Sequence, residues 1–136
     1  MDKRIIRITG AAIIAVAAWG AITLTPSVRI TVGILIGLPS FVLMIISRRQ
    51  LGESFTVKPE ARTLITTGLY SRIEHPMYVF LDLFLVSVII AIGWPVLLLL
   101  WGVLVVIQIL QSQREEKVLS AAFGDQYDIY REKTWF

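Results

Sequence analysis

Long apolar blocks separated by short polar segments dominate this chain. Four blocks can be marked, at residues 5–24, 30–47, 77–92 and 95–109. No residue between Leu83 and Gln113 is charged, and one helix over that stretch would be about 46 Å long, well beyond the ~30 Å hydrocarbon core of a bilayer. Gly93 and Pro95 interrupt the stretch, and this pair of residues breaks helices. The pattern therefore predicts two membrane spans joined by a tight hairpin, in a total of four.

The charged residues between the blocks predict which side of the membrane each segment faces. All thirteen Lys and Arg except Arg29 lie before or at the start of the first block, between the second and the third, or after the fourth. Four spans place these segments on one side, and segments rich in Lys and Arg face the cytoplasm. We therefore expect an integral, multi-pass membrane protein with both termini and residues 48–76 in the cytoplasm.

The predicted fold class is an all-α membrane bundle of four transmembrane helices, with a cytoplasmic C-terminal helix and tail, forming a single membrane domain over residues 1–136. Residues 51–67 mix apolar and charged side chains and are interpreted as an interfacial connector. Good helix formers at 111–122 extend the fourth helix into the cytoplasm, and Gly124 marks its end. A signal peptide over the first block is an alternative, although such apolar regions span only roughly 7–15 residues.

Composition limits the chemistry. The chain is 56% hydrophobic, whereas soluble domains are nearer ~45–50% apolar. The absence of cysteine excludes disulfides, thiolate metal sites and a cysteine nucleophile. With one histidine and no clustered ligand spacing, we expect no tightly bound metal. The net charge of +3 could suggest a nucleic-acid partner, but its distribution follows the membrane topology, so we expect none.

Two glycines in the second block carry a packing signal. Gly33 and Gly37 are four residues apart, a spacing that allows helices to approach closely in lipid. We interpret this pair as a helix-packing contact, with a dimer face as the less favoured alternative.

Polar residues gather at the two ends of the predicted hairpin. Pro76 suits the first turn of a helix, so His75, Tyr78 and Asp82 should share one helix face. Gln108, Gln111 and Glu115 have the same spacing at the end of the fourth block, with Glu116 beside them. The two sets should face each other at the cytoplasmic side. Because polar groups within a membrane are costly, we expect a functional site there.

Both sets also have purely structural explanations. Asp82 could cap a helix or pair with a residue of the C-terminal tail near the interface. The sequence Arg114-Glu115-Glu116-Lys117 could be a solvated helix exit with surface ion pairs, each worth only ~0–1 kcal/mol.

The polar residues together form a longer pattern. It runs from Gly-x-Tyr through His-Pro-x-Tyr to Glu-Glu-x-x-Leu-x-x-x-Phe-Gly-x-x-Tyr-x-x-Tyr, within residues 66–133. The matching positions are Gly68, Tyr70, His75, Pro76, Tyr78, Glu115, Glu116, Leu119, Phe123, Gly124, Tyr127 and Tyr130. This pattern resembles the integral-membrane methyltransferase superfamily, which includes isoprenylcysteine carboxyl methyltransferases and phospholipid N-methyltransferases.

The resemblance implies S-adenosylmethionine as methyl donor and a cofactor site formed by residues 66–82 and 108–133. The implied binding residues are Leu69, Tyr70, Arg72, His75, Pro76, Tyr78, Gln111, Glu115 and Glu116. The acidic pair would accept hydrogen bonds from the ammonium or ribose, and the start of the third span would hold the carboxylate. The acceptor should be a lipophilic molecule entering from the bilayer, either a prenylcysteine-like carboxylate or a lipid amine. An amine needs a base, for which Glu115 and Asp82 are the catalytic candidates.

Two departures from the superfamily pattern concern the acceptor. Glu74 replaces the usual arginine before His-Pro, and Ala122 replaces a basic residue before Phe-Gly. Two other functions stay open. An NADPH-dependent membrane reductase of the steroid 5-alpha type would need cations for a 2′-phosphate, and Arg48, Arg49 and Arg72 are the available ones. A non-catalytic membrane scaffold would use the polar residues only to anchor helix ends.

Overall fold

The computed structural model describes residues 3–52 and 64–134, with side chains from residue 12 onward. In this part of the chain all regular structure is helical, which confirms the all-α prediction. The elements are α1 (Lys3–Thr23), α2 (Pro26–Leu51), the 3₁₀ helix η2 (Gly68–Ser71), α3 (Pro76–Ile92), α4 (Leu97–Phe123) and α5 (Asp125–Lys133). Most of the predicted interfacial connector, residues 53–63, lies outside the described residues.

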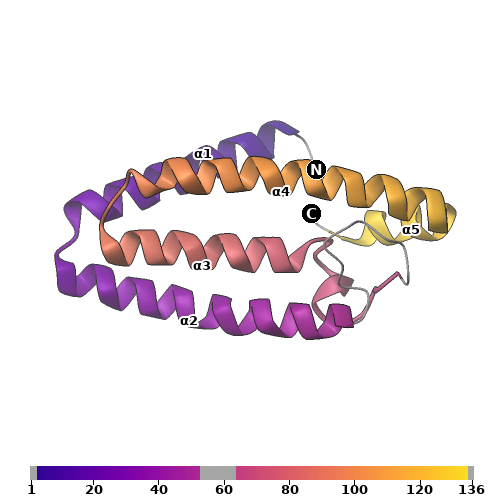
Figure 1. Cartoon of the computed structure of the whole chain (residues 1–136), viewed down its shortest axis with the longest axis horizontal. Helices are drawn as coiled ribbons and strands as arrows, with labels where there is room; N and C mark the ends of the chain where they lie inside the picture. Colours follow the sequence, from indigo (N-terminus) through magenta and orange to yellow (C-terminus); the bar gives the residue numbers. More distant parts are fainter. Residues whose placement is uncertain (1–2, 53–63, 135–136) are drawn as a thin grey trace.

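Helix α3 lies at the centre of the bundle. Helix α2 packs along one side of it, and α1 and α4 pack along the other (Figure 1). The α1–α2 and α3–α4 connections lie at one end of the molecule, whereas η2, the start of α3 and α5 lie at the opposite end (Figure 1). The ends of the predicted hairpin are therefore neighbours in space, as the sequence pattern requires.

The helix boundaries follow from residues with special backbone preferences. Pro26 and Pro76 open α2 and α3 in the first turn, where a missing N–H costs nothing. Gly93 ends α3 in the left-handed region at φ 78°, so the predicted hairpin between α3 and α4 is present. Gly124 ends α4 at φ 49°, and α4 continues past its apolar part as expected.

Within the described residues, two helices are long and apolar enough to cross a bilayer. These are α2 with 26 residues and α4 with 27, which extend about 40 Å at 1.5 Å per residue. Helix α3 is apolar but has only 17 residues, and α1 contributes a shorter apolar segment, Ala12–Thr23. Large apolar side chains on the outer faces of α2 and α4, such as Leu35 and Leu99, are exposed. That surface suits contact with lipid.

The predicted glycine contact is formed within the chain. Gly33 and Gly37 are buried against α3. A Cβ atom at Gly33 would lie 2.7 Å from the methyl carbon of Ala91, and one at Gly37 would lie 2.5 Å from Ser87 Oγ. The absence of side chains at these two positions lets α2 and α3 approach closely.

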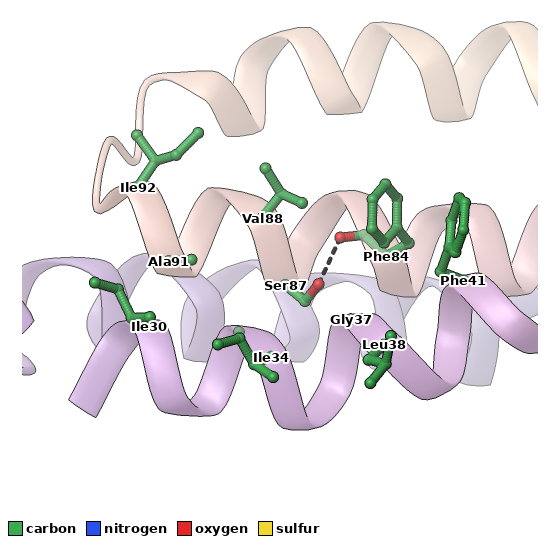
Figure 2. A pocket seen from close by; sticks show the side chains of 11 residues that line it. Ile30, Ile34, Gly37, Leu38, Phe41, Phe84, Ser87, Val88, Ala91 and Ile92 are labelled. Atoms are coloured by element: carbon green, nitrogen blue, oxygen red, sulfur yellow. Dashed lines mark hydrogen bonds between the residues drawn. The ribbon is translucent and has the colours of Figure 1, made fainter. Parts of the chain in front are cut away.

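An apolar groove of 550 Å³ runs beside this contact, between α2 and α3 (Figure 2). Its walls include Ile34, Leu38, Phe84 and Val88. Its one polar side chain, Ser87, donates to the Phe84 carbonyl at 2.6 Å (Figure 2). The groove therefore offers hydrophobic contact and no polar chemistry.

Candidate functional site

The start of α3, the end of α4, η2 and α5 converge at one end of the bundle (Figure 1). The approach to α3 is fixed by Gly68, whose φ of 62° favours glycine. The side chain of Gln50 lies against it, and Gln50 Oε1 accepts the Leu69 N–H at 2.9 Å. The turn that precedes His75 is thus anchored to the end of α2.

Helices α3 and α4 meet through a polar cluster around Glu115. Tyr78 Oη donates to Glu115 Oε1 at 2.8 Å, and Gln111 Nε2 donates to the same oxygen at 3.2 Å. His75 Nδ1 lies 3.6 Å from Glu115 Oε2. The rings of His75 and Tyr78 stack, with centroids 5.6 Å apart. Four residues predicted from sequence spacing are therefore brought together.

Helix α5 packs on residues that adjoin this cluster. Tyr127 Oη donates a short hydrogen bond to Glu74 Oε1, and Tyr130 Oη donates to the Tyr70 carbonyl at 2.8 Å. Arg131 Nη2 lies 3.3 Å from Glu116 Oε2. These contacts attach α5 to η2, to the start of α3 and to α4.

The tyrosine hydroxyls of the site are neutral donors near neutral pH. Burial raises the pKa of the Tyr70 hydroxyl to about 12, and the charge of Glu115 adds to the rise. Burial also raises the pKa of Tyr127 and Tyr130, with Glu74 contributing in both cases. Tyr127 and Tyr130 can therefore hold their acceptors over the whole physiological pH range.

The cluster keeps unused binding capacity and partial access to solvent. The side chains of His75 and Glu115 are 18% and 26% exposed, and that of Glu116 is 27% exposed. Among the described residues, His75 Nε2 is buried without a hydrogen-bond partner. Glu74, His75 and Glu116 each place one potential metal-ligand atom within 4.8 Å of the others. A buried polar atom without a partner is costly, so these groups are suited to receive a ligand.

Asp82 occupies a separate polar position deeper along α3. Trp101 Nε1 donates to Asp82 Oδ1 at 3.1 Å. With the Gln108 amide oriented so that its nitrogen faces the carboxylate, that nitrogen lies 2.9 Å from Asp82 Oδ2. Asp82 is thus held by two donors from α4, whereas the sequence grouped it with the face of His75.

The remaining predicted binding residues play different parts. Pro76 is fully buried and starts α3, Leu69 is half-buried in η2, and Arg72 is exposed. Sequence reasoning did not identify Glu74 as part of the site. It also did not predict the hydrogen bond from Trp101 to Asp82 or the ion pair between Arg131 and Glu116. The two tyrosines three residues apart in α5 were the available signal that this helix docks on the site.

A comparison with protein-family models gives one match that bears on this site. A model described as phospholipid methyltransferase matches residues 28–126. The match begins in α2, includes η2, α3 and α4, and ends at the start of α5. Neither the comparison with curated proteins nor that with solved structures gave a significant match. The matched range contains all the residues of the Glu115 cluster.

Proposed function

The chain belongs to the phospholipid methyltransferase family, and from this premise we propose that it transfers a methyl group from S-adenosylmethionine to the amine of a lipid headgroup. The observation that carries this proposal is the partly exposed cluster of His75, Tyr78, Gln111 and Glu115, with Glu74 and Glu116 beside it. It lies at the end of apolar helices, where a lipid headgroup and a soluble donor can both reach it.

The proposed topology has four membrane-crossing helices with both termini in the cytoplasm. Helices α1 and α3 join α2 and α4 as spans, although α3 extends only about 25 Å. The charges support this arrangement, because Arg48 and Arg49 end α2 and Arg114 follows the apolar part of α4. The cluster would then face the cytoplasm, which supplies the methyl donor.

The side chains of the cluster fit the groups of S-adenosylmethionine. Its ammonium and ribose hydroxyls are donors, and Glu115 and Glu116 present partly exposed acceptors. Its carboxylate needs donors, which His75 Nε2 and the first N–H groups of α3 can supply. Tyr70, Tyr78 and Leu69 offer apolar surface for adenine, and the exposed Arg72 is a further cation at the rim.

Three carboxylates at the site favour an amine acceptor over a carboxylate. Glu74, Glu115 and Glu116 attract a protonated amine, whereas they repel a prenylcysteine-like carboxylate. When bound, S-adenosylmethionine would supply an electrophilic methyl group: a new bond to the amine nitrogen would replace the bond to the sulfonium sulfur, which would become a neutral thioether. The remaining acceleration comes from holding the two partners in line and excluding water.

An amine acceptor must lose a proton, and Glu115 is the favoured base. Glu115 belongs to the partly exposed cluster, with 26% of its side chain exposed, whereas Asp82 lies deeper along α3, between Trp101 and Gln108. Asp82→Asn separates the two roles. If Asp82 takes the proton, turnover falls while binding of the donor is unchanged; if it is a structural partner of α4, turnover is unchanged.

Methyl transfer into lipid vesicles tests the proposal. The purified protein is reconstituted with methyl-labelled S-adenosylmethionine in three kinds of vesicle: with an aminophospholipid, with a prenylcysteine lipid, and with neither. We expect label only in the aminophospholipid, and a loss of activity in Glu115→Gln but not in Glu132→Gln, a matched change on α5. Label in the prenylcysteine lipid would make the amine assignment wrong, and no transfer to either lipid would contradict the methyltransferase proposal.

A further inference from the structure

Arg29 is the charged side chain at the end of the bundle opposite the Glu115 cluster. That end holds the α1–α2 and α3–α4 connections (Figure 1). The two stretches of sequence that include this end, residues 5–52 and 83–114, contain no Asp or Glu. The chain therefore offers Arg29 no carboxylate there, and an isolated guanidinium is suited to bind an anion from outside the chain.

The guanidinium of Arg29 has unused hydrogen-bond donors. Nη1 donates to the Ala21 carbonyl in the last turn of α1 at 2.9 Å. Within the described part of the chain this is its one hydrogen bond, and Nε is buried without a partner. The group packs against Gly93 at the end of α3. Because Arg29 is partly exposed, its remaining N–H groups can bind a phosphate, which a planar guanidinium recognises well.

The position of Arg29 in α2 corresponds to the edge of the hydrocarbon core of a bilayer. Arg29 and Arg48 lie near opposite ends of α2, and the stretch between them is about 28 Å long at 1.5 Å per residue. The hydrocarbon core is ~30 Å thick. When α2 crosses a bilayer, Arg29 therefore lies at the level of the lipid headgroups. The exposed hydroxyls of Thr25 and Ser27, 3.4 Å apart, add polar groups at this level.

The apolar groove between α2 and α3 begins beside Arg29. Ile30, the next residue in α2, lies at one end of the groove with Ile92 (Figure 2). Phe41 and Phe84, whose ring centroids are 5.4 Å apart, lie at the other end. From Ile30 to Phe41 the helix extends about 16 Å, close to the ~15 Å of one leaflet, half of the hydrocarbon core. The groove therefore has the length and the lining that suit one acyl chain.

We propose that Arg29 and this groove form a binding site for a phospholipid, with the phosphate on the guanidinium and one acyl chain between α2 and α3. A cation without a carboxylate partner and an apolar groove of leaflet length match the two parts of such a molecule. This lipid is distinct from the methyl acceptor, because the length of α3, about 25 Å, separates its headgroup from the Glu115 cluster. A free phosphate ion would use only Arg29, and a helix of a second copy would use only the groove.

Native mass spectrometry of the full-length protein in detergent tests the site. The delipidated protein is titrated with phosphatidylglycerol and, separately, with diacylglycerol of the same chains, which lacks the phosphate. We expect one phosphatidylglycerol per chain, bound at least about tenfold more tightly than diacylglycerol, the scale of one hydrogen bond to a charged group. Inorganic phosphate should not displace the lipid, because it cannot use the groove.

Ile34→Trp and Leu35→Trp are a matched pair at neighbouring positions of α2. Ile34 lines the groove and is 58% exposed, whereas Leu35 is 68% exposed and is not part of the lining. Both positions have room for a larger side chain, so folding should be retained. Ile34→Trp should weaken binding of phosphatidylglycerol at least about tenfold, because displacing a few methylene groups has an effect of that scale. Leu35→Trp should leave binding unchanged.

Arg29→Gln tests the phosphate contact. It should lower the affinity for phosphatidylglycerol to that for diacylglycerol, and thermal unfolding shows whether the variant is folded. An affinity equal to that of the parent in folded Arg29→Gln would overturn the proposal. So would equal binding in Ile34→Trp and Leu35→Trp, which does not depend on the stability of the Arg29 variant.

The other possible occupants have their own signatures. Equal affinity for the two lipids would mean that no phosphate is recognised, and displacement by inorganic phosphate would mean a site for a free anion. A dimer that Ile34→Trp dissociates would assign the groove to a second copy of the chain. Each of these results would overturn the phospholipid site. The titration uses no methyl donor, so its outcome does not depend on the methyltransferase proposal.

Discussion

Helix α5 is held on the site by two tyrosine hydroxyls, and replacing each by phenylalanine gives a matched pair of variants. Tyr127→Phe keeps a ring that is 1% exposed and removes the donor to Glu74. Glu74 is only 8% exposed, so water cannot readily replace that donor. A hydrogen bond to a charged group contributes about 1.5–3 kcal/mol, and this is the expected loss in the free energy that docks α5.

Tyr130→Phe is the control, because its hydroxyl donates to a neutral acceptor. Tyr130 is 7% exposed and bonds the Tyr70 carbonyl at 2.8 Å. A hydrogen bond between neutral groups contributes about 0.5–1.5 kcal/mol. The two variants remove the same atom from similarly buried rings, so the difference between them reports the charge of Glu74.

Hydrogen exchange of the backbone amides of residues 125–133 measures the effect directly, because local opening of α5 exposes them. A change of ~1.4 kcal/mol corresponds to a factor of ten. Tyr127→Phe should therefore accelerate exchange about tenfold to a hundredfold, and Tyr130→Phe about twofold to tenfold. Equal acceleration in the two variants, or none in Tyr127→Phe, would refute the proposed role of the Glu74 contact.

Four further predictions concern stability. Gly93→Ala should destabilise the protein by roughly 1–3 kcal/mol, because φ is positive there and a Cβ atom would meet the guanidinium of Arg29. In Gly102→Ala a new Cβ meets open space, so stability should rise by up to ~1 kcal/mol. Thermal unfolding measures both variants, and a change in melting temperature of the same sign in Gly93→Ala and Gly102→Ala would contradict this prediction. Gly33→Ala should lower the melting temperature by forcing α2 away from α3, and an unchanged value would mean the helices are not tightly packed there. The raised pKa of Tyr70 implies a contribution to the free energy of unfolding that is complete below pH 10.0 and is lost as the pH rises through about 12. The difference in absorbance between the parent and Tyr70→Phe should show tyrosinate forming near pH 12. Formation of tyrosinate near pH 10 in the folded protein would contradict the burial of Tyr70.

Much of the fold followed from local sequence signals. Gly93 and Pro95 predicted the hairpin, and Gly124 predicted the end of α4, because these residues limit the backbone wherever they occur. The Gly33 and Gly37 spacing correctly predicted close packing. It could not identify the partner helix, which depends on the small residues of α3 and on how the chain returns. The number of membrane spans stays a prediction, since α1 and α3 are shorter than α2 and α4.

The candidate site was predictable where it depends on helix periodicity. His75 and Tyr78 share a face of α3, Gln111 and Glu115 share a face of α4, and the hairpin brings them together. The position of Asp82 was less predictable, because its donors Trp101 and Gln108 are selected by the depth at which α4 crosses α3. The pairing of Glu74 with α5 depends on how that helix docks, which spacing along the chain does not specify.

Binding of S-adenosylhomocysteine to the purified full-length protein, measured by calorimetry in detergent with NADPH as a parallel ligand, tests the central claim most directly. We expect micromolar binding of the nucleoside and none of NADPH. Glu116→Gln should weaken nucleoside binding by about tenfold or more, the scale of one lost charged hydrogen bond, whereas the exposed Glu132→Gln should not. Absence of nucleoside binding to folded protein, or equal affinity in the two variants, would contradict the site, and binding of NADPH instead would favour a reductase.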